Sequence, residues 1–281
     1  TSWGDPNLQG TWSYASLTPL QRPTSLGERE YYSEEEAAER NIAVTRDVAP
    51  PPGSVGSYNA LWFDRGSVSP DLRTSLITDP TNGRLPVRPE TTAKAAAARA
   101  YTADHPADSW LDRSNWDRCI TYHGVPPVST GYNNTYQIFQ TPNYIAILVE
   151  NIHDVRVIPL DGRSQLTPEI RQWNGDSRGR WEGDTLVVET RNFSNQTQHR
   201  FPSSPDTVAV ERFRRLDDNT LEHTFTIEDN AVYTQPWTGM RHMPRLSEYI
   251  IYEYACHEGN YAMTNILSAE RTGEANASNE Q

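Results

Sequence analysis

The sequence predicts a mainly β protein whose antiparallel sheet is strongly curved or closed into a barrel, with helices at its periphery. From about Tyr132 onward, short runs rich in β-branched and aromatic residues follow one another closely. The connectors at 141–143, 182–184 and 217–219 are short enough for hairpins, which parallel strands cannot use. An antiparallel order of strands follows from these two observations.

The predicted strands together form one continuous sheet over residues from about 132 to 257. The segments 207–216 and 220–228 form the clearest hairpin, because only three residues separate them. The expected strands cover residues 136–140, 144–150, 155–160, 185–190, 207–216, 220–228, 232–237 and 248–255.

The first 130 residues predict an N-terminal strand, loops and two outer helices. Ser33 and Glu36 have the spacing of a capping box, so the first helix begins there. An alanine-rich stretch predicts the second helix over about 89–101. We interpret the 281 residues as a single domain with an outer part over 1–130, the main sheet over 131–270 and a disordered tail over 272–281.

Composition excludes several kinds of partner. The net charge is −12, and no cluster of Lys and Arg could follow a phosphate backbone, so nucleic acid is not expected as a partner. The longest apolar run, at 144–149, is far shorter than the roughly 20 residues of a membrane-spanning helix, so no membrane insertion is expected. A small-molecule substrate is the expected partner, and a homo-oligomer is left open.

Cysteine usage suggests an exported protein. Cys119 and Cys256 are the two cysteines, and this even count predicts one long-range disulfide, with two buried thiols as the alternative. The chain begins at Thr1 without a hydrophobic leader, as expected after signal-peptide removal or for a trimmed chain. We therefore expect a periplasmic or secreted location.

Two resemblances sharpen the expectation. Gly10-Thr11-Trp12 resembles the first-strand signature of lipocalins, and residues 180–186 look like a barrel hairpin, which implies a lipocalin-like barrel. Most of the chain, from Leu17 to Leu267, is similar to a widespread family of exported bacterial proteins without assigned function. The segments that carry this second resemblance are 132–134, 157–163, 171–173, 175–179 and 254–261.

Motif searches predict neither a cofactor nor a metal. Residues 175–179 fit Gly-x-Ser-x-Gly, but no buried strand precedes them and no helix follows, so we interpret them as a structured turn. The sequence has no His-Glu-x-x-His, phosphate loop or dinucleotide fingerprint. His153, His257 and a carboxylate offer metal-binding chemistry, but their spacing does not support a metal site.

Strand parity selects the catalytic candidates, because residues two apart project to the same face. If the strand continues from Ile147 to Val157, His153 lies among inward-facing valines and becomes the candidate base. In the segment 220–229 His223 shares a face with Leu221 and Phe225, and a satisfied core histidine is the alternative to a substrate-binding role.

The segment 249–258 adds acidic and basic candidates. His257 and Glu253 share one face and would supply the complementary proton, whereas Glu258 lies on the other face and would replace them if that face is inside. A solvated surface position is the alternative for Glu253. Arg156 would hold a carboxylate or oxyanion, and Tyr136 would donate a hydrogen bond.

The sequence therefore favours an enzyme that performs acid–base chemistry as a lyase, hydratase, isomerase or hydrolase on a small polar substrate, sugar-derived or aromatic, in a barrel cavity. A periplasmic binding protein and a structural envelope protein are the alternatives. The residues expected to bind substrate are Trp173, Asp176, Arg171, His223, Asn134 and Glu258.

Overall fold

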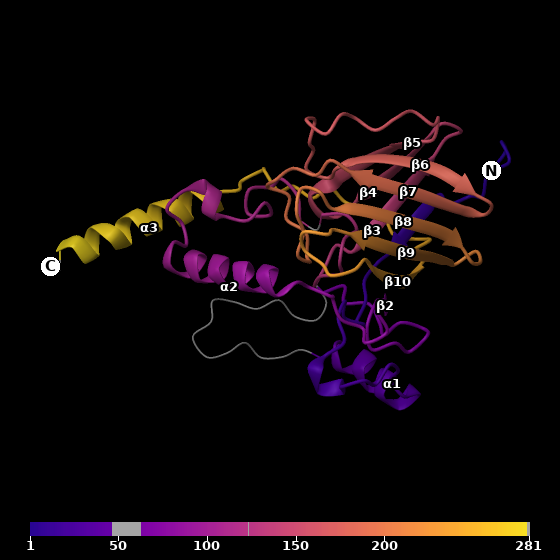
Figure 1. Ribbon diagram of the computed structural model, residues 1–281, viewed down its shortest axis with the longest axis horizontal. Coiled ribbons are helices and arrows are strands. Elements are labelled where there is room, and N and C mark those ends of the chain that lie inside the picture. The colour runs from indigo at the N-terminus through magenta and orange to yellow at the C-terminus, as the bar shows by residue number, and fades with distance from the viewer. Residues whose placement is uncertain (47–62, 123, 280–281) are drawn as a thin grey trace.

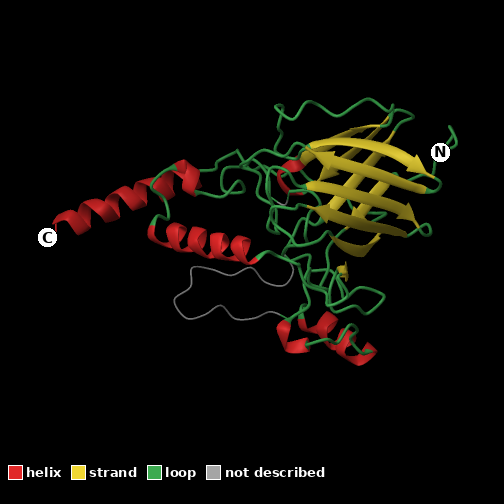
Figure 2. Cartoon of the chain, in the orientation of Figure 1, coloured by secondary structure: helices red, strands yellow, loops and turns green. Residues whose placement is uncertain are grey.

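The computed structural model describes residues 1–46, 63–122 and 124–279 of the chain. The protein is mainly β, with two antiparallel sheets that face one another and α-helices that lie outside them (Figures 1 and 2). The smaller sheet has the order β1 (Gly10–Ser13), β3 (Thr135–Gln140), β4 (Tyr144–Val149) and β5 (Asp154–Pro159). The larger has the order β2 (Ile77–Asp79), β10 (Trp237–Pro244), β9 (Thr220–Glu228), β8 (Val208–Arg215), β7 (Thr185–Arg191) and β6 (Asp176–Glu182).

The mainly β, antiparallel class is confirmed, but the prediction of one continuous sheet is wrong. The predicted hairpin is present, with Val208 opposite Glu228 and Leu221 opposite Arg215. Strand β5 is bonded to β4 and strand β6 to β7, while β5 and β6 lie beside each other without pairing. The chain leaves β5 at Pro159 and crosses to the second sheet through a long irregular segment, so the ladder is interrupted there.

The two predicted helices lie where the sequence placed them, outside the sheets, and a third was not predicted. Helix α1 (Glu34–Ala43) begins with the predicted capping box, in which Ser33 accepts from Glu36 N and the Glu36 carboxylate accepts from Ser33 N. Helix α2 covers Pro89–Asp104. Helix α3 (Ala262–Asn279) occupies most of the tail for which we expected disorder. None of the helices in the described ranges has the length and apolar character needed to span a membrane.

The main hydrophobic core lies between the inner faces of the two sheets. Period-two burial along each strand directs its apolar side chains there, as along β9, where Leu221, His223, Phe225 and Ile227 are all buried. The smaller sheet contributes Trp12, Tyr136, Ile138, Ile145, Ile147, Val149 and Ile158, and the larger contributes Leu186, Val188, Phe213, Leu221 and Met243.

Two expected strands are absent from the described structure. Residues 248–255 are irregular, and Ile250 and Tyr252 are 69% and 78% exposed, so strand-forming side chains there have no sheet to pack on. Residues 232–236 are also irregular apart from a single β-bridge between Tyr233 and Val87, and the strand begins only at Trp237. The sequence did not predict β10, because Gly239, Arg241 and Pro244 interrupt its apolar pattern.

Candidate functional site

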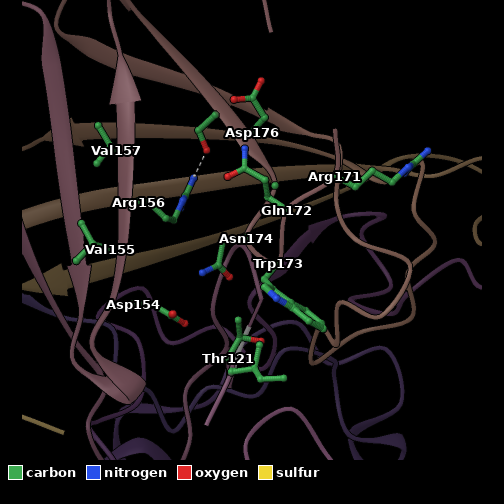
Figure 3. Close-up of a pocket in the computed structure, with 13 residues that line it drawn as sticks. Thr121, Asp154, Val155, Arg156, Val157, Arg171, Gln172, Trp173, Asn174 and Asp176 are labelled. Carbon is green, nitrogen blue, oxygen red and sulfur yellow. Dashed lines mark hydrogen bonds between the residues drawn. The ribbon is translucent and has the colours of Figure 1, made fainter. Parts of the chain in front are cut away.

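A polar pocket of about 560 Å³ opens at the seam between the two sheets, where β5 and the start of β6 lie beside each other without pairing (Figure 3). We call it the seam pocket. It is lined by the consecutive residues Asp154–Val157 of β5, by the segment Arg171–Ser177 and by Ile120 and Thr121. Three separate parts of the chain therefore build one site.

Close packing shuts the seam beyond the pocket. A Cβ on Gly179 would lie 2.6 Å from Leu160 Cδ2 and 2.9 Å from Ile158 Cγ2, closer than real Cβ atoms approach other atoms. Only glycine allows β6 to approach these side chains so closely. The two sheets thus meet tightly at Gly179, and the space opens toward Asp154.

The turn between β4 and β5 aims Asp154 into the pocket. A short 3-10 turn, η4 (Asn151–His153), joins the two strands, and Ile152 and His153 have φ angles of +59° and +49°. Positive φ is rare for non-glycine residues and is an outlier for a β-branched one, so the local backbone is strained. Asp154 follows directly as the first residue of β5, and Figure 3 shows its carboxylate facing the pocket.

The carboxyl of Asp154 in the pocket has a strongly shifted pKa. Burial raises the pKa of its carboxyl to about 6, while the Asn174 side chain and the neighbouring His153 act in the opposite direction. Asn174 and Trp173 come from the facing segment. A carboxyl that exchanges its proton near pH 6 can serve as an acid or a base under ordinary conditions.

The other carboxyl in the pocket is already engaged. Asp176 is buried, and its Oδ1 lies 2.5 Å from Arg178 Nη1 while its Oδ2 accepts from Leu166 N at 2.7 Å. Arg171 donates to the carbonyl oxygen of Phe193 at 3.1 Å. These residues fix the segment that faces β5.

Behind the pocket, a chain of ionisable side chains joined by hydrogen bonds crosses the interior between the sheets. Arg156 Nη2 lies 2.6 Å from Glu211 Oε2, and His223 Nε2 lies 3.1 Å from Glu211 Oε1. Arg241 donates from Nε and Nη2 to His223 Nδ1, at 3.1 and 2.9 Å. Because Nδ1 accepts, Nε2 carries the proton of a neutral imidazole and donates it to Glu211. We call Arg156, Glu211, His223 and Arg241 the interior network.

The pKa values of Glu211 and His223 in the interior network lie far from neutral pH, so their protonation states are fixed there. Burial alone would raise the pKa of Glu211, but the Arg156 charge and the hydrogen bond from His223 lower it to about 2. Burial, and then the Arg241 charge, lowers the pKa of His223 to about 4. His223 is thus the satisfied core histidine that the sequence offered as the alternative to a substrate-binding residue, and it does not line the seam pocket.

Four of the predicted site residues line the seam pocket, namely Arg156, Arg171, Trp173 and Asp176. The prediction that His153 faces inward is wrong. The chain turns at residues 150–153, so the residues that follow face the opposite side from the one predicted by counting along a continuous strand. His153 is exposed, and its Nδ1 lies 2.9 Å from the Tyr254 carbonyl oxygen. Val155 and Val157 are 56% and 58% exposed, whereas Arg156 is buried.

The remaining predicted residues lie elsewhere. Tyr136 is buried in the core, and Asn134 is buried where its amide donates to the carbonyl oxygens of Asp64 and Thr130. The expected acid–base partners from the segment 249–258 are all exposed, and none of them lines the seam pocket: Glu253, His257 and Glu258. Their predicted strand is absent, so they have no common sheet face.

Sequence reasoning missed Asp154, Asn174 and Thr121. A usable signal for Asp154 was the largely polar run 150–154 between two apolar runs, which is typical of a turn. The described residues contain no group of three or more His, Cys, Asp or Glu side chains that could hold a metal ion. Comparison with known family models, with curated proteins and with solved structures finds no match to this chain.

Proposed function

We propose that the protein is an exported enzyme that performs acid–base chemistry without a cofactor on a small polar organic substrate in the seam pocket. The main support for this proposal is that Asp154 lines a pocket of about 560 Å³ and that burial raises the pKa of its carboxyl to about 6. General acids and bases act best when their pKa lies near the working pH. A lyase, hydratase, isomerase or hydrolase reaction would use such a group.

In this proposal each wall of the pocket has its own task. Asp154 exchanges the proton, and the indole of Trp173 offers a face on which a sugar or aryl ring stacks. Asn174 supplies hydrogen bonds opposite Asp154. His153 precedes Asp154 in the chain but lies exposed at the turn and does not line the pocket, so this proposal gives it no contact with the substrate.

The test combines a substrate search with a matched pair of variants. The protein is incubated with small sugar acids, amino sugars and aryl acids, and turnover is followed by proton NMR. Asp154→Asn should lower the rate about 10²–10⁴-fold with the fold intact. Asp161→Asn is the control, because Asp161 is an exposed carboxylate paired with Arg163. Equal rates for the two variants would exclude Asp154 as the proton carrier.

A periplasmic binding protein is the second candidate. The ion pair between Asp176 and Arg178 favours a binding protein, because this pairing leaves no second free carboxyl in the pocket to act together with Asp154. Saturable binding that Asp154→Asn weakens, together with unchanged ligand after long incubation, would select binding over catalysis.

The proposal includes a lipocalin-like barrel and a periplasmic or secreted location. Contacts of β5 with β6 and of β1 with β10 support a flattened barrel made from the two sheets, and Trp12 of the Gly-x-Trp signature lies in its core. The Cys119–Cys256 disulfide supports an oxidising compartment. The resemblance to a family of exported bacterial proteins is part of the same proposal.

A further inference from the structure

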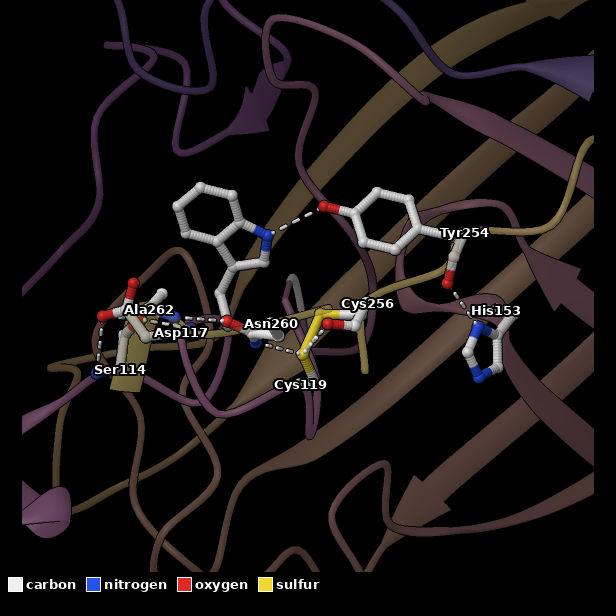
Figure 4. Close-up of a disulfide and its surroundings, with 9 residues drawn as sticks. Ser114, Asp117, Cys119, His153, Tyr254, Cys256, Asn260 and Ala262 are labelled. Atoms are coloured by element: carbon white, nitrogen blue, oxygen red, sulfur yellow. Dashed lines mark hydrogen bonds between the residues drawn. A yellow bond between two sulfur atoms is a disulfide. The ribbon is translucent and has the colours of Figure 1, made fainter. Parts of the chain in front are cut away.

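The predicted disulfide between Cys119 and Cys256 is confirmed, and it borders a second pocket (Figure 4). This pocket has a volume of about 420 Å³, and we call it the disulfide pocket. Trp116 and Tyr254 line it, and Trp116 Nε1 donates to the Tyr254 hydroxyl at 3.0 Å. A small molecule in this pocket would lie beside the disulfide bond.

The two cysteine residues differ in accessibility. Cys119 is 7% exposed and does not line the pocket, whereas Cys256 is partly exposed and does. Thiol–disulfide exchange needs access to one sulfur atom along the S–S axis, and the other sulfur departs. The geometry therefore distinguishes an attacked sulfur, on Cys256, from a leaving sulfur, on Cys119.

A hydrogen-bond donor faces the leaving sulfur. Asn260 Nδ2 lies 3.2 Å from Cys119 Sγ, and Asn260 also lines the disulfide pocket. A leaving thiol departs faster when its thiolate is stabilised, and an amide N–H supplies that stabilisation. The donor is already in place in the oxidised protein.

We propose that the disulfide pocket is a thiol–disulfide exchange site for small neutral or cationic thiols. The thiolate of the incoming molecule forms a bond to Cys256 Sγ, the Cys119–Cys256 bond breaks, and Cys119 leaves with the electron pair as a thiolate held by Asn260. A second thiolate then attacks the mixed disulfide and releases Cys256. In total two thiols are oxidised to their disulfide while the protein disulfide is reduced to two thiols.

Charge in the pocket wall sets the preference among thiols. Glu253 lines the pocket, is exposed, and makes no ion pair within the described ranges. Asp117, the other lining carboxylate, is paired with Arg113 at 3.1 Å. The uncompensated Glu253 charge disfavours an anionic thiol through like-charge repulsion.

Thiol–disulfide exchange at this site would affect the walls of the seam pocket. Cys119 directly precedes Ile120 and Thr121, which line the seam pocket. On the other side of the bond, the carbonyl oxygen of Tyr254 lies 2.9 Å from His153 Nδ1, next to Asp154. Opening the disulfide frees both of these wall segments from their covalent link.

The experiment uses the folded, oxidised protein without denaturant. It is mixed with cysteamine, 2-mercaptoethanol or 3-mercaptopropionate, free thiols are trapped by alkylation, and peptide mass spectrometry locates the mixed disulfide. The adduct should form on Cys256 at least tenfold more often than on Cys119. Rates divided by thiolate concentration should be lowest for 3-mercaptopropionate, and Glu253→Gln should remove that difference.

A matched pair of variants tests the donor. Asn260→Ala should slow the first exchange step about tenfold, the effect expected from losing one hydrogen bond to a developing charge. Asn265→Ala, an exposed asparagine of α3, should leave the rate unchanged. Equal adducts on both cysteines, reaction only after urea unfolds the protein, or equal rates for the two variants would overturn the proposal. The wild-type adduct position decides the question even if Asn260→Ala does not fold.

Discussion

The interior network and the seam pocket both place ionisable side chains among apolar strands, but the network pairs all of its carboxylates, whereas the pocket pairs Asp176 and leaves Asp154 without an ion pair within the described ranges. In the interior, Glu211 lies between Arg156 and His223, and Arg241 completes the chain. In the pocket, the carboxyl of Asp154 is desolvated and has no ion pair within the described ranges. The first arrangement fixes protonation, and the second leaves a proton to exchange near pH 6.

This difference shows that burial alone does not select a candidate acid or base. His223 is fully buried and its pKa is strongly lowered, yet both of its ring nitrogens are hydrogen-bonded, one to Glu211 and the other to Arg241. Asp154 is less buried but borders free space. The useful indicator is a perturbed pKa together with a cavity and an uncommitted polar atom.

The largest expected effect comes from breaking the interior network. Glu211→Gln removes its anion and leaves Arg156 and Arg241 buried without compensation, so the free energy of unfolding should fall by about 3–5 kcal/mol. Urea denaturation measures it. The control Glu222→Gln breaks a more exposed ion pair with Arg214 and should lower stability by less than about 1 kcal/mol. Similar losses in both variants would contradict compensation in the interior.

The next effect is a pH dependence from Asp154. Its folded pKa of about 6 lies above the unfolded value of about 3.9, so the native state binds more protons between these values. Stability from this group is therefore present below about pH 4 and is lost as pH rises to about 6, by up to about 3 kcal/mol. Asp154→Asn should lack this loss when urea unfolding is compared at pH 4.5 and 7.5. Parallel pH profiles for the two proteins would contradict the desolvation of Asp154.

A smaller effect concerns the closed end of the seam. Gly179→Ala would press a Cβ against Leu160 and Ile158 and should lower the free energy of unfolding by about 1–3 kcal/mol. Gly273→Ala is the control, because a Cβ at that position meets no atom within 4 Å. Thermal unfolding monitored by circular dichroism compares the two. No loss for Gly179→Ala would mean that the seam is not tightly closed there.

The smallest expected effect is that of His153 on the pKa of Asp154. His153→Gln removes a nearby group that lowers the pKa of Asp154, so this pKa should rise slightly above about 6. Stability should change by less than about 0.5 kcal/mol, because the side chain is exposed. Carbon NMR titration of the Asp154 carboxyl gives the pKa. A fall in that pKa would show that His153 does not lower it.

Local patterns predicted several of the strands, but they did not predict how the two sheets meet. The alternation in β8 and β9 predicts the observed hairpin, because both period and turn are local. The seam pocket depends on how β5 meets the segment 171–177, which belongs to a different sheet. No periodicity within either segment specifies that contact.

The individual site residues show the same limit. His153 was assigned to the inner face because the alternation was counted straight through residues 150–153. The turn there shifts the count by one residue, so the positions after it face the opposite side. Arg171 and Trp173 were singled out by residue type and do line the pocket. The compensation of Glu211 by Arg156 requires the two sheets to be stacked, so it could not be derived from one strand at a time.

The open edge of β5 also bears on how the protein avoids self-association. Val155 and Val157 are exposed on a strand that has a bonded neighbour on one side only, and such an edge is a template for pairing with another chain. The segment 171–174 borders the pocket beside this strand, β6 lies next to the strand, and Pro159, which has no N–H, ends it. The proximity of β6 and the proline at the strand end therefore also limit edge-to-edge aggregation through β5.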